Sequence, residues 1–419
     1  MSRDKADRLV IDARNFGLVL LLALFLGNDL LIKYVSPVWG YFDELFAALA
    51  IPVVLFSLRK TGSRLRNDHS TVLTIFFLAL FALCGFVGTF VNRYMPAVNT
   101  MLDLFALVKY FLAVTAARLL FRGFDMDGAA RAIWNTLRPV TAALFVFAMA
   151  DVLTGAISHG EVRLGVLHSV KLIFSIYTIL AEITVLMAAV YVRLYQYYGR
   201  RVLPYLIMTL AVMASTLRYK AFGAAIMIVF IYLTICRRRR NPGVLAWTVL
   251  IAVMAAATVG QFIEYYANTT FTTPRDVLQS TALQIAREYF PFGTGFATFA
   301  TAFSVTPYSP VYYIYHIDAV WGLSPTYYAF ITDTFWPMLL AETGVLGLGF
   351  YIAALAGHVR RVLRIGRVNA CGYASALVLL GYFFIASSSE TAFASSYAAG
   401  FGMWIGVQLE DADRRRRMT

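Results

Sequence analysis

Apolar runs long enough to cross a membrane recur along the whole chain, and they restrict its fold more than any other feature. A run of about 20 apolar residues spans the hydrocarbon core of a bilayer as an α-helix. The runs are continuous rather than alternating, which argues against a spanning β-barrel. Charged residues make up 14% of the chain, whereas a soluble domain has about 25%. The sequence therefore predicts an all-α polytopic membrane protein.

We expect about 12 transmembrane helices, with one large polar loop before the last three. The predicted spans are 15–35, 42–58, 71–92, 100–121, 138–157, 170–192, 202–217, 221–236, 243–265, 335–355, 372–389 and 393–409. The chain then divides into residues 1–265, a loop at 266–334 and residues 335–419 with a basic tail. The loop is expected to contain short helices, because Pro274 opens a segment with apolar residues at helical spacing.

The distribution of Lys and Arg predicts how the spans are oriented. Most of the 36 basic residues fall in loops on one side of the predicted topology, which the positive-inside rule assigns to the cytoplasm. Both termini are then cytoplasmic, and the long loop faces outward. Clusters such as Arg237–Arg240 are interpreted as topology signals beside anionic lipid. The net charge of +13 is therefore not taken as a sign of nucleic-acid binding.

Nine basic residues lie on the outward side, against this bias. They are Lys33, Arg93, Lys109, Arg163, Lys171, Arg218, Lys220, Arg275 and Arg287. An anionic ligand on the outer face is one reason for such residues, since guanidinium groups bind phosphate oxygens in a bidentate manner. The alternative is that an arginine pairs with a neighbouring carboxylate such as Asp276 or Glu288.

Two of these arginines lie on one predicted helix of the loop. Arg275 and Arg287 are twelve residues apart, or about three helical turns. We therefore expect both side chains on the same side of this helix. A third arginine, Arg218, lies in a tight turn between two short spans, where its side chain could point into a cavity under the loop.

Candidates for a general base are His316, Asp318 and Asp333. Asp333 stands just before an apolar span, where a poorly solvated carboxylate becomes more basic. The alternative is that Asp333 only caps the helix that follows. Glu342 lies nine residues further on, inside the span. Within other spans, Lys109 and Glu182 have opposite charges and are expected to pair.

Aromatic residues crowd one part of the loop. They are Tyr308, Tyr312, Tyr313, Tyr315, Trp321, Tyr327 and Tyr328. An interfacial aromatic belt and a platform for sugar rings both explain this density, and the sequence does not separate them. The run Gly293–Gly295 is a weak match to a phosphate loop, since no strand precedes it. We instead expect a turn that brings Phe292 and Phe296 against the bilayer surface.

Several segments together resemble the Wzy-type polysaccharide polymerases of the O-antigen polymerase/ligase superfamily. The most specific are the runs Pro291–Phe299 and Thr332–Gly347 (TDTFWPMLLAETGVLG), with Tyr308-Ser-Pro between them. The segment at Thr273-Pro-Arg275, the turn Ser215-Thr-Leu-Arg218 and the run Val162-Arg163-Leu-Gly165 are also similar to superfamily elements. Twelve spans with one large outward loop before the third-last span match this pattern as well.

The resemblance implies a metal-independent, inverting glycosyltransferase of the GT-C type in a bacterial inner membrane. Its donor would be a growing glycan on undecaprenyl diphosphate, and its acceptor a single repeat unit on the same lipid. The implied partners are these lipids, the membrane and a chain-length regulator protein, and no cofactor or metal is expected. O-antigen ligases usually carry a histidine where this chain has Asp333, and this departure favours a polymerase.

We therefore predict two sets of site residues. The catalytic set is Asp333, Arg218 and Arg287. The substrate-binding set is Arg163, Arg275, Lys220, Tyr308, Tyr312, His316 and Glu342. Two alternatives remain, an O-antigen ligase of the same superfamily and a transporter or flippase of lipid-linked glycan. A flippase would need charges along a path between both faces, whereas the unexplained cations here concentrate toward one face.

Overall fold

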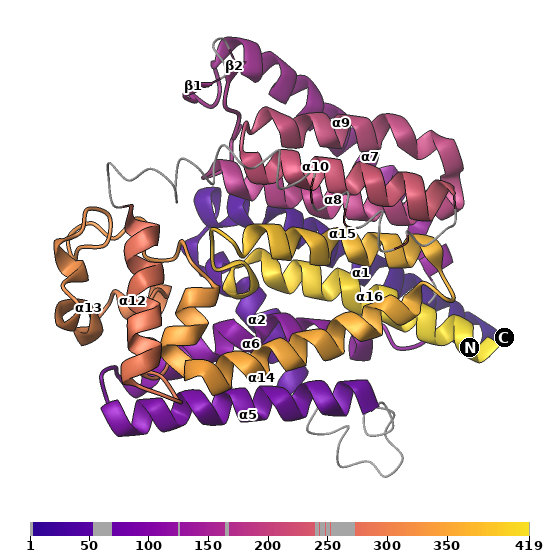
Figure 1. Cartoon of the computed structure of the whole chain (residues 1–419). Coiled ribbons are helices and arrows are strands. Elements are labelled where there is room, and N and C mark those ends of the chain that lie inside the picture. Colours follow the sequence, from indigo (N-terminus) through magenta and orange to yellow (C-terminus); the bar gives the residue numbers. More distant parts are fainter. Residues whose placement is uncertain are drawn as a thin grey trace.

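The structure is a computed structural model, and it describes residues 3–52, 69–124, 126–163, 167–238, 243, 248, 252 and 273–418. Helices dominate these ranges, and they pack side by side (Figure 1). They are α1 (Arg3–Tyr34), α2 (Phe42–Ala48), α5 (His69–Asn92), α6 (Ala97–Leu120), α7 (Met126–Thr154), α8 (Tyr177–Tyr198), α9 (Leu203–Ser215), α10 (Tyr219–Ile231), α12 (Pro274–Glu288), α13 (Pro310–Ile314), α14 (Trp336–Ile365), α15 (Ala370–Ala386) and α16 (Tyr397–Met418). A short antiparallel hairpin, β1 (Val162–Arg163) and β2 (Leu167–His168), follows α7.

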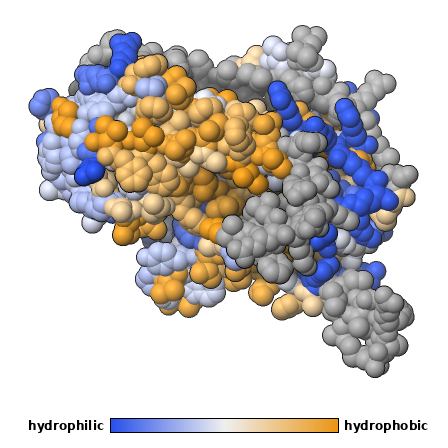
Figure 2. Space-filling view, turned by 90° about the horizontal axis from the view of Figure 1, so that it is seen from below, coloured by the Kyte–Doolittle hydropathy of each residue, from blue (hydrophilic) through white to orange (hydrophobic). Residues whose placement is uncertain are grey.

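Within the described ranges, seven helical stretches are long and apolar enough to cross a membrane. Figure 2 shows hydrophobic residues over the middle of one face, with hydrophilic residues toward its two ends. On α5 the exposed apolar side chains include Phe76, Leu83, Phe90 and Val91. A belt of this kind suits contact with lipid tails. The predicted class, an all-α polytopic membrane protein, is confirmed.

Most predicted spans overlap an observed helix, although their ends differ. The span predicted at 170–192 begins only at Tyr177, because the hairpin and an irregular stretch precede α8. The span predicted at 42–58 starts with α2, but residues 53–68 lie outside the described ranges, as does nearly all of the span at 243–265. The predicted loop helix is present as α12, and Pro274 begins it as expected.

The two ends of the helix bundle differ in character. Figure 1 shows both chain termini at one end and α12 and α13 at the opposite end. Basic residues such as Arg361 and Arg364 close α14 at the end that carries the termini, and Arg415–Arg417 close α16 there. The loop after residue 273 therefore covers the end opposite to these basic clusters.

One predicted ion pair within the spans is wrong. Lys109 does not pair with Glu182, because its Nζ contacts Asp43 Oδ2 at 2.6 Å and Glu44 Oε1 at 3.2 Å. Asp43 and Glu44 lie in the first turn of α2, which packs against α6. Glu182 instead lies near Lys220 and Glu390.

The glycine-rich run after α12 enters the bundle rather than lying on its surface. The N–H groups of Thr294 and Gly295 donate to the carbonyls of Ala341 and Glu342, both at 2.9 Å. These carbonyls are available because α14 is broken at Gly344, whose φ of 66° is a left-handed conformation that favours glycine. Irregular backbone at this depth is tolerated where protein surrounds it.

The predicted contact of this run with the bilayer surface is wrong for Phe296. Its ring is fully buried, and it packs at 5.6 Å from the ring of Phe81 and 5.7 Å from that of Phe86. Gly88 of α5, the helix that carries Phe81 and Phe86, lets the backbone of the run approach closely, since a Cβ there would lie 2.8 Å from Gly293 O. The run is therefore part of the core between α5, α6 and α14.

Candidate functional site

Two cation–carboxylate pairs lie at the end of the bundle where α10 and α14 begin, which is the end predicted to face outward. Arg275 Nη2 is 2.7 Å from Asp333 Oδ2, and Lys220 Nζ is 2.5 Å from Glu390 Oε2. Arg275 comes from the first turn of α12, Asp333 from the turn before α14, and Lys220 from the first turn of α10. The Thr391 N–H donates to the Thr332 carbonyl at 3.1 Å, so the turns that carry Asp333 and Glu390 are adjacent. We name these four residues the outer charge cluster.

Burial and the nearby cations shift the pKa of Asp333 in opposite directions. Burial raises the pKa of its carboxyl above the usual range, while the charges of Arg275 and Lys220 lower it. The N-cap of α14 is Phe335, which makes no side-chain capping bond. Asp333 is therefore not the cap of this helix, and the capping alternative is wrong.

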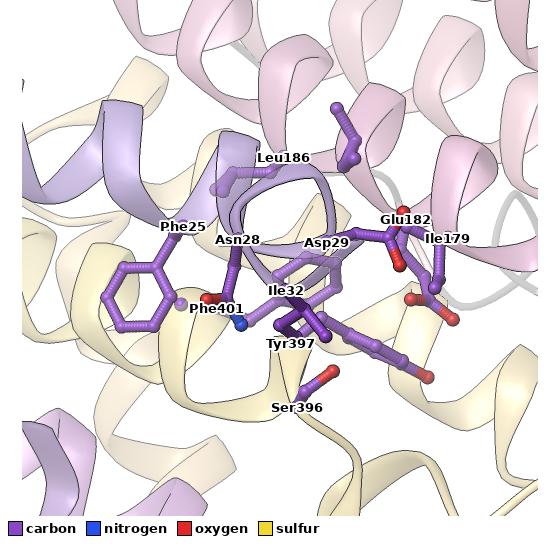
Figure 3. Close-up of a pocket in the computed structure, with 12 residues that line it drawn as sticks. Phe25, Asn28, Asp29, Ile32, Ile179, Glu182, Leu186, Ser396, Tyr397 and Phe401 are labelled. Atoms are coloured by element: carbon purple, nitrogen blue, oxygen red, sulfur yellow. The ribbon is translucent and has the colours of Figure 1, made fainter. Parts of the chain in front are cut away.

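A cavity of about 110 Å³ adjoins the outer charge cluster between α1, α8 and α16. Figure 3 shows the carboxylates of Asp29 and Glu182 together at one side of this cavity, with Tyr397 beside them. The Tyr397 hydroxyl donates to Glu390 Oε1 at 3.0 Å, which connects the cavity to the cluster. Asp29 Oδ2 also accepts a hydrogen bond from the Ser175 N–H at 2.9 Å.

Arg218 lies two residues before Lys220, as the N-cap of α10. Its guanidinium carbon is 4.5 Å from the ring centroid of Tyr177, which starts α8. Lys171 Nζ lies 5.9 Å from the same ring. The turn before α10 therefore places the Arg218 guanidinium against the ring of Tyr177, and a place in a cavity under the loop stays a prediction.

Two of the predicted arginines lie elsewhere. Arg163 is on β1, where it pairs with the exposed Glu161 at 3.1 Å. Arg287 is exposed in the last turn of α12, at the far end from Arg275. Twelve residues make three and one third turns, so the two side chains diverge by about 120°. The prediction that Arg275 and Arg287 share one side of their helix is therefore wrong.

Asp276 and Glu288, the carboxylates next to Arg275 and Arg287, have other partners. Asp276 closes a capping box with Thr273 at the start of α12. Glu288 accepts hydrogen bonds from the Tyr315 hydroxyl and from Gln284. Each acid thus has a role within the loop.

The predicted aromatic site residues mainly shape the loop itself. Tyr312 is fully buried, and its hydroxyl accepts from the Ala300 N–H at 2.8 Å. The Tyr308 hydroxyl donates to the Leu323 carbonyl at 2.6 Å. His316 is exposed with a left-handed backbone, φ 56°. The exposed rings of the loop are other members of the same aromatic group: Tyr313, Trp321, Tyr327 and Tyr328.

Glu342 is buried and holds the glycine-rich run in place. Its Oε1 accepts from the N–H groups of Thr298 and Phe299 at 2.9 and 3.1 Å. Asp103 on α6 supports the same run, since its Oδ2 accepts from the Ala297 N–H at 2.9 Å. Both side chains are at most 1% exposed. This environment gives Glu342 a structural role, and its predicted place in substrate binding stays a prediction.

Sequence reasoning missed Glu390 and Tyr397 as members of this region. Glu390 carried one signal, its position at an outward helix end, but no motif surrounds it. Tyr397 is one of 25 tyrosines, so its position becomes informative only through the contact with Glu390. Of the predicted residues, the structure brings together Lys220, Arg275 and Asp333.

The chemistry available at this end is that of cations, carboxylates and hydroxyl groups. Within the described ranges, no group of three or more His, Cys, Asp or Glu side chains is placed to hold a metal ion. Paired guanidinium, ammonium and carboxylate groups suit the binding of a phosphate-bearing ligand and the transfer of a proton.

No protein-family model matches the chain, and no curated protein matches it at a significant level.

Proposed function

We propose that this protein polymerises oligosaccharide repeat units carried on undecaprenyl diphosphate, at the outer face of a bacterial inner membrane. In this proposal it is an inverting glycosyltransferase of the GT-C type with about twelve spans and cytoplasmic termini. The observation that carries the proposal is the outer charge cluster, which joins Lys220 and Arg275 to carboxylates at one end of the bundle. The resemblance of Pro291–Phe299 and Thr332–Gly347 to Wzy-type polymerases supports the same reaction.

In this proposal, a bound diphosphate replaces the Asp333 and Glu390 carboxylates as the anionic partner of Arg275 and Lys220. Without substrate, Asp333 and Glu390 neutralise Arg275 and Lys220. Diphosphate oxygens form bidentate bonds with guanidinium and strong bonds with ammonium, so they compete for both cations. Arg218, in the turn before α10, adds a third cation to this side. The exchange releases the Asp333 carboxylate next to the bound substrate.

The proposed transfer is a single displacement at the anomeric carbon of the donor. An acceptor hydroxyl oxygen forms the new bond to this carbon, and the bond from the carbon to the diphosphate oxygen breaks. The electron pair goes to the lipid diphosphate, whose increased charge is stabilised by Lys220 and Arg275. The hydroxyl proton passes to Asp333, which acts as the general base and returns the proton to water.

An apolar cavity beside this end offers space for a lipid tail. It measures about 240 Å³ and lies between α1, α7 and α8, with Val19, Leu30 and Phe174 among its lining residues. At its rim Lys33 Nζ donates to the Ile173 carbonyl at 2.9 Å. A polyprenyl chain in this cavity would keep the diphosphate at the outer end of the bundle.

Removing a cation of the cluster is expected to lower the rate of polymerisation. Arg275→Ala and Lys220→Ala should each reduce ladder formation by about 10²-fold, because each removes a donor that stabilises the leaving diphosphate. Arg287→Ala, on the same helix as Arg275 but exposed, serves as the matched control and should retain activity within about twofold. Equal losses in Arg275→Ala and Arg287→Ala would contradict the assignment.

The rate is expected to fall at acidic pH in a way that reports on Asp333. A general base works only when deprotonated, so activity is lost as pH falls through its pKa. Burial raises the pKa of Asp333, so this acid limb should lie above the pH of about 4 expected for an ordinary aspartate. Initial rates between about pH 4 and 8 test this, and Asp333→Glu should keep an acid limb.

The function itself is tested by reconstitution. Purified full chain in bilayers is given one lipid-linked repeat unit and no nucleotide sugar. A ladder of glycans, with one lipid diphosphate released per bond, supports a polymerase. Transfer of glycan only to a different acceptor indicates a ligase, and movement of the lipid between leaflets without new bonds indicates a flippase. Folded protein that forms no ladder contradicts the proposal.

A further inference from the structure

A second cavity lies at the other end of the bundle, on the side that carries the chain termini. It measures about 350 Å³ and opens between α5, α6 and α14. Its walls are mainly apolar, with Leu78, Val108 and Phe111 among the lining residues. Ile51 and Ile75, also in its lining, are 42% and 39% exposed, so the cavity is a groove at the outside of the protein.

The length of this groove matches one leaflet of a bilayer. Along α5 its lining runs from Thr71 to Ala82, a distance of eleven residues. At 1.5 Å per residue this is about 16 Å, or half of the hydrocarbon core of about 30 Å. The groove therefore begins near the end of the bundle and ends near the middle of the membrane.

Cations lie at the mouth of the groove that is nearest the chain termini. Arg118, Arg361 and the hydroxyl-bearing Thr71 line it there. Arg361 Nη1 donates to Thr71 Oγ1, and Arg118 Nη2 pairs with Asp413 Oδ2 at 3.0 Å.

Among the described residues, the charges near Arg361 have a positive balance. Besides Arg118, they include Asp413, Glu410, Arg364 and Arg416. In this part of the chain four guanidinium groups stand against two carboxylates, which favours an anion at this mouth.

We propose that this groove binds one anionic phospholipid from the leaflet at the end of the bundle that carries the termini. One acyl chain lies along α5, α6 and α14, and the lipid phosphate lies between Arg118 and Arg361. The apolar wall of the groove suits an acyl chain, and the length of the groove matches one leaflet. The guanidinium pair suits the lipid phosphate. This site is separate from the outer charge cluster and does not depend on the proposed polymerase activity.

The site is tested by native mass spectrometry of the purified full chain, titrated with phosphatidylglycerol or with phosphatidylcholine of the same acyl chains. The wild-type chain should retain phosphatidylglycerol about fivefold or more over phosphatidylcholine. Arg361→Ala should remove most of this preference, and Arg360→Ala, the exposed neighbour outside the groove, should keep it. Equal retention of the two lipids by the wild-type chain would overturn the proposal.

A steric variant tests the acyl part of the site without changing charge. Ala79 lies exposed on the groove wall, so Ala79→Trp should fill the groove and lower retention of phosphatidylglycerol by about fivefold or more. Leu83→Trp is the matched control, because Leu83 is 58% exposed on α5 outside the groove. Unchanged binding in Ala79→Trp would show that the lipid lies elsewhere, even if Arg361→Ala fails to fold.

Discussion

Asp333→Asn is expected to lower the rate of glycan ladder formation by about 10²- to 10⁴-fold, the range of a lost general base. Asparagine has nearly the same shape, and its carbonyl oxygen can still accept a hydrogen bond from Arg275. The fold and the position of α12 should therefore persist. Initial rates of the purified variant at saturating lipid-linked repeat unit measure the effect, and the pH profile of the residual activity should lack the acid limb.

Two controls make this result specific to proton transfer. Asp333→Glu keeps a carboxylate and should recover part of the rate. A thermal unfolding midpoint within a few degrees of the wild type shows that Asp333→Asn is folded. If Asp333→Asn polymerised at the wild-type rate, Asp333 would be only the partner of Arg275, and Glu390 would become the next candidate for the base.

Glu342→Ala is expected to destabilise the protein more than an alanine substitution at any residue of the outer charge cluster. It leaves the buried N–H groups of Thr298 and Phe299 without their acceptor. Each unpaired buried group costs about 1–3 kcal/mol, so the loss is about 2–6 kcal/mol in total. Low yield of monodisperse protein and a strongly lowered unfolding midpoint are the expected observations.

Glu342→Gln separates the structural role from a chemical one. Glutamine retains the carbonyl oxygen that accepts from both N–H groups, so the unfolding midpoint should stay close to that of the wild type. Ladder formation should then also persist, within about threefold. A folded Glu342→Gln variant without activity would contradict the structural assignment and would return Glu342 to the reacting site.

The membrane class and most helices could be predicted from hydropathy alone, because a span of apolar residues in lipid has few alternatives. The candidate site was only partly predictable. Positive charge on the predicted outward side marked Lys220 and Arg275, position at a span edge marked Asp333, and the structure brings these three residues together. Their partners were not evident, since Arg275 and Asp333 are 58 residues apart and Lys220 and Glu390 are 170 apart.

The wrong predictions have particular physical reasons. Lys109 was paired with Glu182 by charge and depth, but helix packing places α2 and not α8 beside it. The glycine-rich run was predicted as a turn at the bilayer surface, but its backbone has polar partners inside the bundle. The break of α14 at Gly344 supplies those partners, and no local sequence pattern predicts this break. Hydrogen bonds between segments that are distant in the sequence cannot be predicted from hydrophobic periodicity or helix propensity.

The exchange of carboxylates for diphosphate at Lys220 and Arg275 is tested most directly by equilibrium binding of undecaprenyl diphosphate to the purified full chain. The wild-type chain should bind it, and the double variant Lys220→Ala/Arg275→Ala should raise the Kd by about tenfold or more, as expected for lost charged hydrogen bonds. Arg287→Ala should bind like the wild type. Equal Kd values for the wild-type chain and the folded double variant would contradict the account.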